Sequence, residues 1–363
     1  MIDLTKVDYR LTLLPPNGSK IDITNLIDSC THEEMDGEMA ARVSVKMKNV
    51  KRADGWIHQH VFLDKRIVLE ATDGSGWKEI FRGSIKRWKT VAEDHTVEFT
   101  AYDPSFNAMI SKEHYFFPAG MKADASIKQI AVEQGIPLGQ IDGPSIPLAR
   151  KMYNGYIGDT IGGRLKETRL KGGGRFIPRS TAGKFEIVRE GSNKTVYELT
   201  DLTVNSSSDE RSIENLITKV KIYGNEPKPK PKKKKKLAKG EKREKAKIKT
   251  VLAATPKKED PNKDKRPKIS VTVNGDTKFG VIQEVLYSSN FDNMAAAKAA
   301  AQEILDEKGK PEINRPLTHP DIPWVRKGDL IKINSGTING DCIVESVSRN
   351  TQSRMMTLKL RGR

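Results

Sequence analysis

Short segments in which apolar and polar residues alternate recur near both ends of the chain. In residues 43–48, Val43, Val45 and Met47 alternate with polar neighbours, and residues 355–360 repeat the pattern with Met356, Leu358 and Leu360. Alternation with a period of two indicates strands with one buried face. Several such strands at close spacing predict a small β-barrel or sandwich. The strands expected near the N-terminus are 9–14, 21–23, 43–48, 66–71, 78–85 and 96–103, and those near the C-terminus are 329–334, 342–348 and 355–360.

The middle of the chain is expected to be mixed. Residues 126–134 carry apolar residues at helical spacing, and Gly135 ends the segment. Asp159 can cap a second helix that ends at Gly172-Gly173-Gly174, before strands at 175–179 and 184–189. A strand at 216–223, another segment at 279–285 and an alanine-rich helix at about 293–308 follow. The sequence therefore predicts an α+β, β-rich fold.

The positive charge of the chain is concentrated in one segment. The 363 residues carry a net charge of +17, but residues 226–268 hold 19 Lys/Arg against 6 Asp/Glu, which leaves only +4 for the rest. A chain of this length usually forms two or three domains. We expect a first β-domain at 1–110, a mixed α/β domain at 111–200, a second β-domain at 201–225 with 269–363, and a lysine-rich insert at 226–268.

The sequence also limits the compartment. No apolar run reaches the roughly 18 to 20 residues of a membrane-spanning helix, and the N-terminus has no secretory signal pattern. Cys30 and Cys342 are the only cysteines, so neither a disulfide framework nor a four-cysteine zinc site is expected. A reducing compartment and no membrane partner are the expectations.

Two groups of residues could suggest catalysis or metal binding. His58 and His60 would share one side of a strand, but His32, His95 and His114 offer no assignable third ligand. Glu33, Glu34, Asp36 and Glu38 could supply the carboxylate pair of a glycosidase, yet no apolar pocket is indicated that would raise one pKa. We expect a solvated strand face for the histidines, an exposed loop for the acids, and no catalytic residues, cofactor or metal.

Two glycine clusters and the lysine-rich insert are the remaining candidates for ligand binding. Gly162-Gly163-Arg164 and Gly172-Gly173-Gly174-Arg175 do not fit the P-loop spacing, so a helix end with a turn is expected. The insert at 226–268 could be a solvated spacer, a clamp on an acidic protein partner, or a nucleic-acid-binding arm. It contains no aromatic residue, which disfavours base stacking and makes nucleic acid the weakest of the three.

Nine segments spread along the chain carry a resemblance to a known family. They are 279–285 (FGVIQEV), 303–311 (EILDEKGKP), 325–333 (VRKGDLIKI), 342–347 (CIVESV), 355–360 (MMTLKL), 80–85 (IFRGSI), 97–103 (VEFTAYD), 158–161 (GDTI) and 173–176 (GGRF). Through these segments, most of the chain outside the insert resembles the baseplate hub proteins of contractile phage tails, including those of defective prophages and phage-tail-like bacteriocins. One departure is Arg349, where the family pattern would have a histidine, and another is the lysine-rich insert, which the pattern does not require.

The resemblance implies a structural, non-enzymatic protein. In this family, two domains with the fold of the tail-tube subunit flank a middle region, and three chains form a ring between the tail tube and the central spike. The implied partners are further copies in a homotrimer, the tube protein, the spike protein, other baseplate proteins and the tape measure. The implied location is the baseplate of a virion or phage-tail-like particle assembled in the bacterial cytoplasm.

Two other functions stay open from sequence. A nucleic-acid-binding protein would act through the insert, with steeply salt-dependent affinity. A cell-wall hydrolase of the tail tip would need a fused catalytic domain, for which we see no additional length. The sequence indicates neither the host, nor a phage rather than a bacteriocin particle, nor which residues form each interface.

Overall fold

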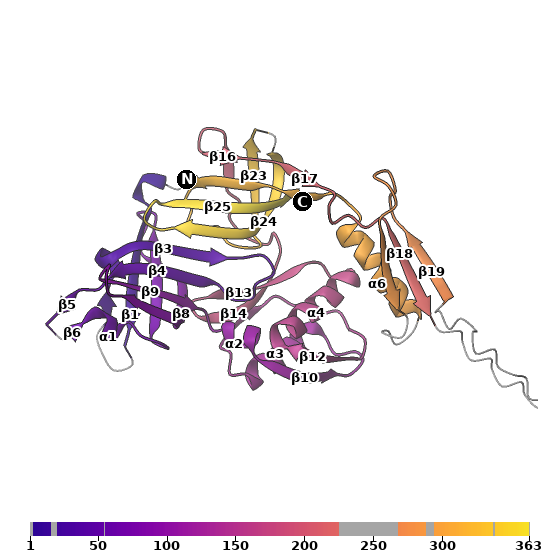
Figure 1. The fold of residues 1–363 in the computed structure, drawn as a ribbon, viewed down its shortest axis with the longest axis horizontal. Helices are drawn as coiled ribbons and strands as arrows, with labels where there is room; N and C mark the ends of the chain where they lie inside the picture. Colours follow the sequence, from indigo (N-terminus) through magenta and orange to yellow (C-terminus); the bar gives the residue numbers. More distant parts are fainter. Residues whose placement is uncertain are drawn as a thin grey trace, which may run out of the picture. The chain divides into compact units, whose positions relative to one another are not determined.

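The computed structural model describes residues 3–15, 20–53, 55–224, 268–287, 294–336 and 338–362. It divides into two compact units (Figure 1). The first comprises Met1–Arg211 with Ile313–Arg363, and the second comprises Ser212–Glu312. No helix in these described ranges is both long and apolar enough to cross a membrane.

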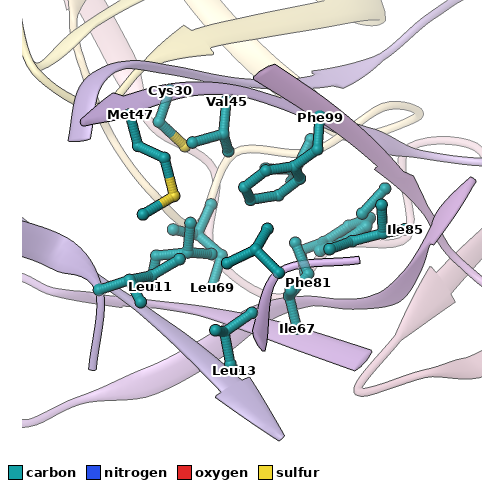
Figure 2. Close-up of a cluster of buried hydrophobic side chains, with 14 of the residues drawn as sticks. Leu11, Leu13, Cys30, Val45, Met47, Ile67, Leu69, Phe81, Ile85 and Phe99 are labelled. Carbon is teal, nitrogen blue, oxygen red and sulfur yellow. The ribbon is translucent and has the colours of Figure 1, made fainter. Parts of the chain in front are cut away.

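A first β-domain forms half of the 13-stranded sheet in the first unit. Its strands are antiparallel in the order β3-β4-β9-β8-β7-β1-β2. The sheet curls around a core in which side chains such as Leu11, Met47 and Phe99 point toward one another (Figure 2). The elements are η1 (Leu4–Lys6), β1 (Asp8–Leu14), β2 (Ile21–Asp22), η2 (Thr24–Leu26), β3 (Ile27–Glu34), β4 (Arg42–Lys48), β5 (Lys51–Arg52), β6 (Gly55–Trp56), α1 (Ile57–His60), β7 (Arg66–Thr72), β8 (Lys78–Val91) and β9 (Thr96–Tyr102).

A second β-domain continues the same sheet. Strand β24 pairs with β25 and with β23, and the end of β24 pairs with β3 of the first β-domain. Figure 1 shows β3 and β24, far apart in sequence, as neighbours in the first unit. The core of this domain includes Ile331, Val344 and Leu358. Its strands are β15 (Glu198–Thr200), β16 (Ser206–Ser207), β22 (Pro316–Pro320), β23 (Leu330–Ser335), β24 (Ile338–Asn350) and β25 (Met355–Gly362).

The middle region contains three helices and two small sheets. Helices α3 and α4 pack around a core with Phe117, Ile127 and Phe185. Helix α4 begins at Ile157, and Tyr156 is its N-cap, so Asp159 lies in the first turn instead of capping the helix as predicted. The elements are α2 (Phe106–Ile110), β10 (Lys112–Phe117), α3 (Ala123–Glu133), β11 (Leu138–Ile141), β12 (Lys151–Tyr156), α4 (Ile157–Leu170), β13 (Phe176–Thr181) and β14 (Lys184–Arg189).

The second unit is a three-stranded sheet with one helix. Its strands β18 (Lys219–Gly224), β19 (Lys268–Asn274) and β20 (Gln283–Tyr287) lie in the order β19-β18-β20, and α6 (Met294–Lys308) packs on the sheet. A separate core of Val220, Ile222 and alanines of α6 holds this unit together. Two short strands, β17 (Glu210–Ser212) and β21 (Glu312–Asn314), lie where the chain passes between the units.

The α+β, β-rich class predicted from sequence is confirmed. The division of the chain differs from the predicted boundaries, since the segments expected to form one second β-domain are shared between the two units. The physical reason is that β22, β25 and β23 extend the sheet of the first β-domain through β24, whereas strands β18–β20 and helix α6 bury apolar side chains in a core of their own.

Candidate functional site

The seam between the two β-domains is made by four opposed residue pairs of β3 and β24. Arg349 lies opposite His32, and Val347 lies opposite Glu34. His32, Glu34 and Arg349 are all buried. Because a buried charge needs a partner, the seam must supply hydrogen bonds and opposite charges within the protein.

Arg349 meets that requirement with groups from both β-domains. Its Nε donates to Oδ1 of Asp321 at 3.2 Å, and Nη2 donates to the carbonyl oxygen of Val325. The hydroxyl of Tyr9, on β1, donates to the other carboxylate oxygen of Asp321. Burial raises the pKa of Asp321, and the charge of Arg349 opposes that rise. Strands β1 and β24 are thereby joined through the carboxylate of Asp321.

His32 is neutral in this arrangement. Burial, reinforced by the charge of Arg349, lowers its pKa to about 3. A neutral ring can accept a hydrogen bond through its unprotonated nitrogen. Nδ1 of His32 lies 3.2 Å from Nη1 of Arg349, and a guanidinium can only donate hydrogen bonds. His32 therefore serves as a hydrogen-bond acceptor at the seam, not as a metal ligand or a general base.

Glu34 forms a second set of contacts across the seam, and through Arg326 these contacts extend to the middle region. Nε of Arg326 donates to Oε1 of Glu34 at 2.8 Å, and the backbone N–H of Lys327 donates to Oε2 at 2.9 Å. Arg326 also donates to the hydroxyl of Thr181 at 2.8 Å and to the carbonyl of Ser180 at 2.7 Å. Burial would raise the pKa of Glu34, but the charge of Arg326 holds it well below its usual range.

Two further contacts complete this group of residues. The Lys327 ammonium donates to the carbonyls of Met35 and Glu38, at 3.2 and 2.6 Å, and so fixes the turn after β3. Arg179 of β13 pairs with Asp329 at 3.1 Å. We call the whole set the polar junction. Its members are Tyr9, His32, Glu34, Arg179, Asp321, Arg326, Lys327, Asp329 and Arg349.

The polar junction has the properties of a structural lock. Each of its three carboxylates is paired with an arginine, the Lys327 ammonium donates to backbone carbonyls, and most of its members are buried. Breaking a buried pair leaves an uncompensated charge and costs several kcal/mol, so such pairs hold their partners in one arrangement. What the geometry can do is keep the first β-domain, the middle region and the second β-domain together as one body.

The acidic cluster is not the exposed loop that was expected. Glu33 and Glu34 are the last two residues of β3, and Glu34 is only 2% exposed, against Arg326. Glu33 pairs with Arg42 of the neighbouring strand at 2.6 Å. Asp36 and Glu38 lie in the turn that follows. The prediction was wrong for the first two because their carboxylates have arginine partners, which sequence alone does not show.

The histidine pair also lies elsewhere than predicted. His58 and His60 belong to helix α1, not to a strand, so a spacing of two places them on different sides. Nδ1 of His58 lies 3.1 Å from the side-chain oxygen of Asn49. Among the described residues, no group of three or more His, Cys, Asp or Glu side chains is placed to hold a metal ion.

The glycine clusters form a helix and the turn after it. Gly172 and Gly174 have φ of +80° and +87°, which glycine adopts without strain after the end of α4. Arg164, inside α4, is fully buried and donates to the carbonyl of Met121 at 2.7 Å and to the hydroxyl of Ser126 at 3.1 Å. The arginine is therefore committed to the protein's own groups.

A hollow of about 260 Å³ lies on the outer face of the first β-domain. Its floor carries the hydroxyls of Thr31, Ser44 and Thr100. Its acid, Glu98, lies within 3.9 Å of Lys46 and 3.7 Å of Lys89, so it is paired and partly exposed. The hollow contains no carboxylate in apolar surroundings, which is what a glycosidase acid requires.

The lysine-rich insert lies outside the described residues, except for Lys268, the first residue of β19. Its two ends are fixed, because Gly224 of β18 is the pairing partner of Lys268. Residues 225–267 therefore connect two adjacent antiparallel strands.

Sequence reasoning missed the polar junction. A signal existed in β3, where Cys30, His32 and Glu34 alternate with more exposed residues. The partners of His32 and Glu34 lie about 300 residues further along the chain, so the pattern could indicate an inward face but not what the face meets.

The YQBQ-like family model matches residues 65–264, more than half of the chain. The chain belongs to the YQBQ-like family. No curated protein sequence matches this family member.

Solved structures with a similar fold include tail proteins and a type VI secretion component. The 43 kDa tail protein of prophage MuSo2 from Shewanella oneidensis is 9% identical with a TM-score of 0.63, over 97% of this YQBQ-like chain and 98% of that chain. A tail protein from Neisseria meningitidis is 11% identical with a TM-score of 0.63, over 98% and 97% of the two chains. An E. coli type VI secretion component, described as similar to the T4 tail proteins gp27 and gp5, is 10% identical with a TM-score of 0.51, over 97% of this chain and 76% of that chain. The resemblance to baseplate hub proteins inferred from sequence is confirmed at the level of the fold.

Proposed function

We propose that this chain is a structural component of a phage tail or phage-tail-like particle, and specifically the baseplate hub adaptor between the tail tube and the central spike. The observation that carries the proposal is the fold, which is shared over 97–98% of the chain with a prophage tail protein and a second tail protein. The polar junction supports it, since an adaptor under mechanical load requires domains that do not separate.

The proposed assembly is a ring of three chains. Each chain carries two β-domains on one continuous sheet. In the proposal these two domains are similar modules, so three chains present six of them and match a six-fold tube to a three-fold spike. Head-to-tail interfaces close into rings when their rotation permits. The proposed partners are two further copies, the tube protein, the spike protein, other baseplate proteins and the tape measure, in a particle assembled in the bacterial cytoplasm.

The proposed role is non-enzymatic. Of the ionisable residues singled out by the sequence, Glu33, Glu34, His32 and His58 are engaged in the polar junction or in strand and helix contacts. A tail-tip hydrolase or a nucleic-acid-binding arm receives no support from a described residue, so neither is proposed as a second function.

The test is removal of the gene from a host that produces the particles. We expect no assembled tails, with sheath and tube proteins left unassembled, and restoration by the unmodified gene in trans. A variant with Arg326→Met and Glu34→Gln, which dismantles one tie of the junction, should restore fewer tails. Normal tails in the complete absence of the gene would refute the adaptor role.

A further inference from the structure

The two-stranded ribbon of β10 and β12 leaves one face uncovered. The strands pair antiparallel with each other, with Phe116 opposite Met152 and Lys112 opposite Tyr156, and the described residues place no third strand beside them. Tyr115, Phe117 and Tyr153 point inward to the core of the middle region. Because strand residues alternate between faces, the next residues along each strand point outward.

The outward face is apolar at both ends. Met152 is 71% exposed, Phe116 is 52% exposed and Tyr156 is 42% exposed. Phe116 and Met152 form a directly opposed pair, so their side chains make one contiguous apolar surface. Large apolar side chains gathered on one exposed face mark an interaction site more often than a scattered single residue does. Methionine adapts its shape to a partner, which suits a contact surface.

The same face carries positive charge without compensation. Lys112 Nζ lies 4.7 Å from the ring centre of Tyr156, and the Arg150 guanidinium lies 5.1 Å from that of Phe116. Neither cation pairs with a carboxylate in the part of the chain that the structure describes. Lys151 provides the contrast, since it binds Glu167 at 2.6 Å.

These observations decide between two classes of partner. Basic and aromatic side chains on a strand pair could bind single-stranded nucleic acid by base stacking. Here, however, one cation already lies over the ring of Phe116 and another over the ring of Tyr156, so a stacking base would have to compete with these cation–π contacts. An acidic protein segment can use the cations where they stand and bury the apolar pair.

We propose that the outer face of the β10–β12 ribbon is a docking surface for an extended acidic protein segment of another protein, with an apolar side chain seated between Phe116 and Met152. Strand residues advance about 3.3 Å each. The backbone of Arg150 therefore lies roughly 7 Å beyond that of the apolar pair on one side, and the backbone of Lys112 lies roughly 13 Å beyond it on the other. The complementary segment has its apolar residue at position i and acids at about i−2 and i+4.

The test reads the surface directly, independently of the proposed function. The full chain is labelled with ¹³C in its methionine methyl groups, and the Met152 signal is assigned with Met152→Leu. The probe is a threonine peptide with leucine at position i and aspartate at i−2 and i+4. We expect the Met152 signal to move on titration, and a peptide with lysine in place of aspartate to leave it unmoved.

Two double variants distinguish binding by the cations of this face from a general effect of the positive charge of the chain. Lys112→Glu with Arg150→Glu should weaken peptide binding at Met152 by about tenfold or more, as for loss of two charge pairs in a partly desolvated interface. Lys128→Glu with Lys194→Glu makes the same change in net charge on exposed residues elsewhere and should leave it unchanged.

Four results would overturn the proposal. They are no movement of the Met152 signal at millimolar peptide, equal binding by the Lys112→Glu/Arg150→Glu variant, movement with oligo-dT that the same variant abolishes, and a concentration-dependent shift without peptide. The third would assign the face to nucleic acid, and the fourth would assign it to a second copy of this chain.

Discussion

Replacing Arg349 with methionine should destabilise the first unit severely. The side chains of Arg349 and Asp321 are 1% and 0% exposed and lie 3.2 Å apart. Arg349→Met leaves the carboxylate of Asp321 buried without its counter-charge, with only the Tyr9 hydroxyl as a donor. Removing one partner of a buried pair typically costs about 3–5 kcal/mol. We expect a loss of that size at pH 7.

The double variant distinguishes a charge effect from a packing effect. Arg349→Met combined with Asp321→Asn removes both charges, so we expect it to recover about 2 kcal/mol or more of the loss. The exposed pair Lys332–Glu198, at 3.5 Å with side chains 55% and 51% exposed, is the control. Lys332→Met should cost less than about 1 kcal/mol.

The assay is urea unfolding followed by tryptophan fluorescence. All four tryptophans, at positions 56, 77, 88 and 324, belong to the first unit, so the signal reports that unit alone. Without Arg349, the already raised pKa of Asp321 should rise further, and the deficit of the single variant should shrink as pH falls from 7 toward 4. A single-variant loss below about 1 kcal/mol, or a double variant as unstable as the sum of its parts, would refute the lock.

Three further outcomes are expected. Replacing residues 225–267 with Asn-Gly should keep the far-UV CD spectrum and melting temperature, since a two-residue turn can join the paired strands; loss of the folded state would show that the segment is part of the structure. The lowered pKa of His32 means that its contribution is complete above pH 6.5 and is lost as pH falls toward 3, so His32→Asn should flatten the decline of stability in that window, measured by urea unfolding at several pH values; an unchanged slope would contradict its burial as a neutral ring. Gly83→Ala should cost about 2 kcal/mol or more, because its Cβ would stand 2.2 Å from the carbonyl oxygen of Tyr102, whereas Gly143→Ala meets nothing within 4 Å and should be nearly neutral in thermal melts; equal effects would contradict the β8–β9 packing.

The strands that were predicted best from the sequence are those with one face exposed to solvent and the other buried. Residues 43–48 and 355–360 alternate cleanly because the sheet buries one side of β4 and β25 and exposes the other. Strand β3 was missed because its last residues read as an acidic loop. Glu34 can be buried only because Arg326, 292 residues further along the chain, pairs with it. A single sequence does not show that pairing.

The boundaries of the domains depend on pairing of the same kind. The strand predicted at 216–223, before the break in composition, ends one residue short of the end of β18, which spans Lys219–Gly224. That residues 316–362 join the first unit follows from the register of β24 against β3, in which Arg349 meets His32. The arginine that departs from the family pattern is thus the residue on which the seam depends, and its burial could not be read from its neighbours.

The most direct test of the adaptor account is a cryo-electron microscopy reconstruction of the intact particle without imposed symmetry at the baseplate. The account predicts three copies of this chain in a closed ring between the tube and the spike. It also predicts that the two β-domains of each chain superpose on one another and occupy alternate positions under a six-fold tube, with interfaces larger than about 1,200 Å². A ring with any other number of copies, or two β-domains with unrelated strand order, would contradict it even if the protein were found in the tail.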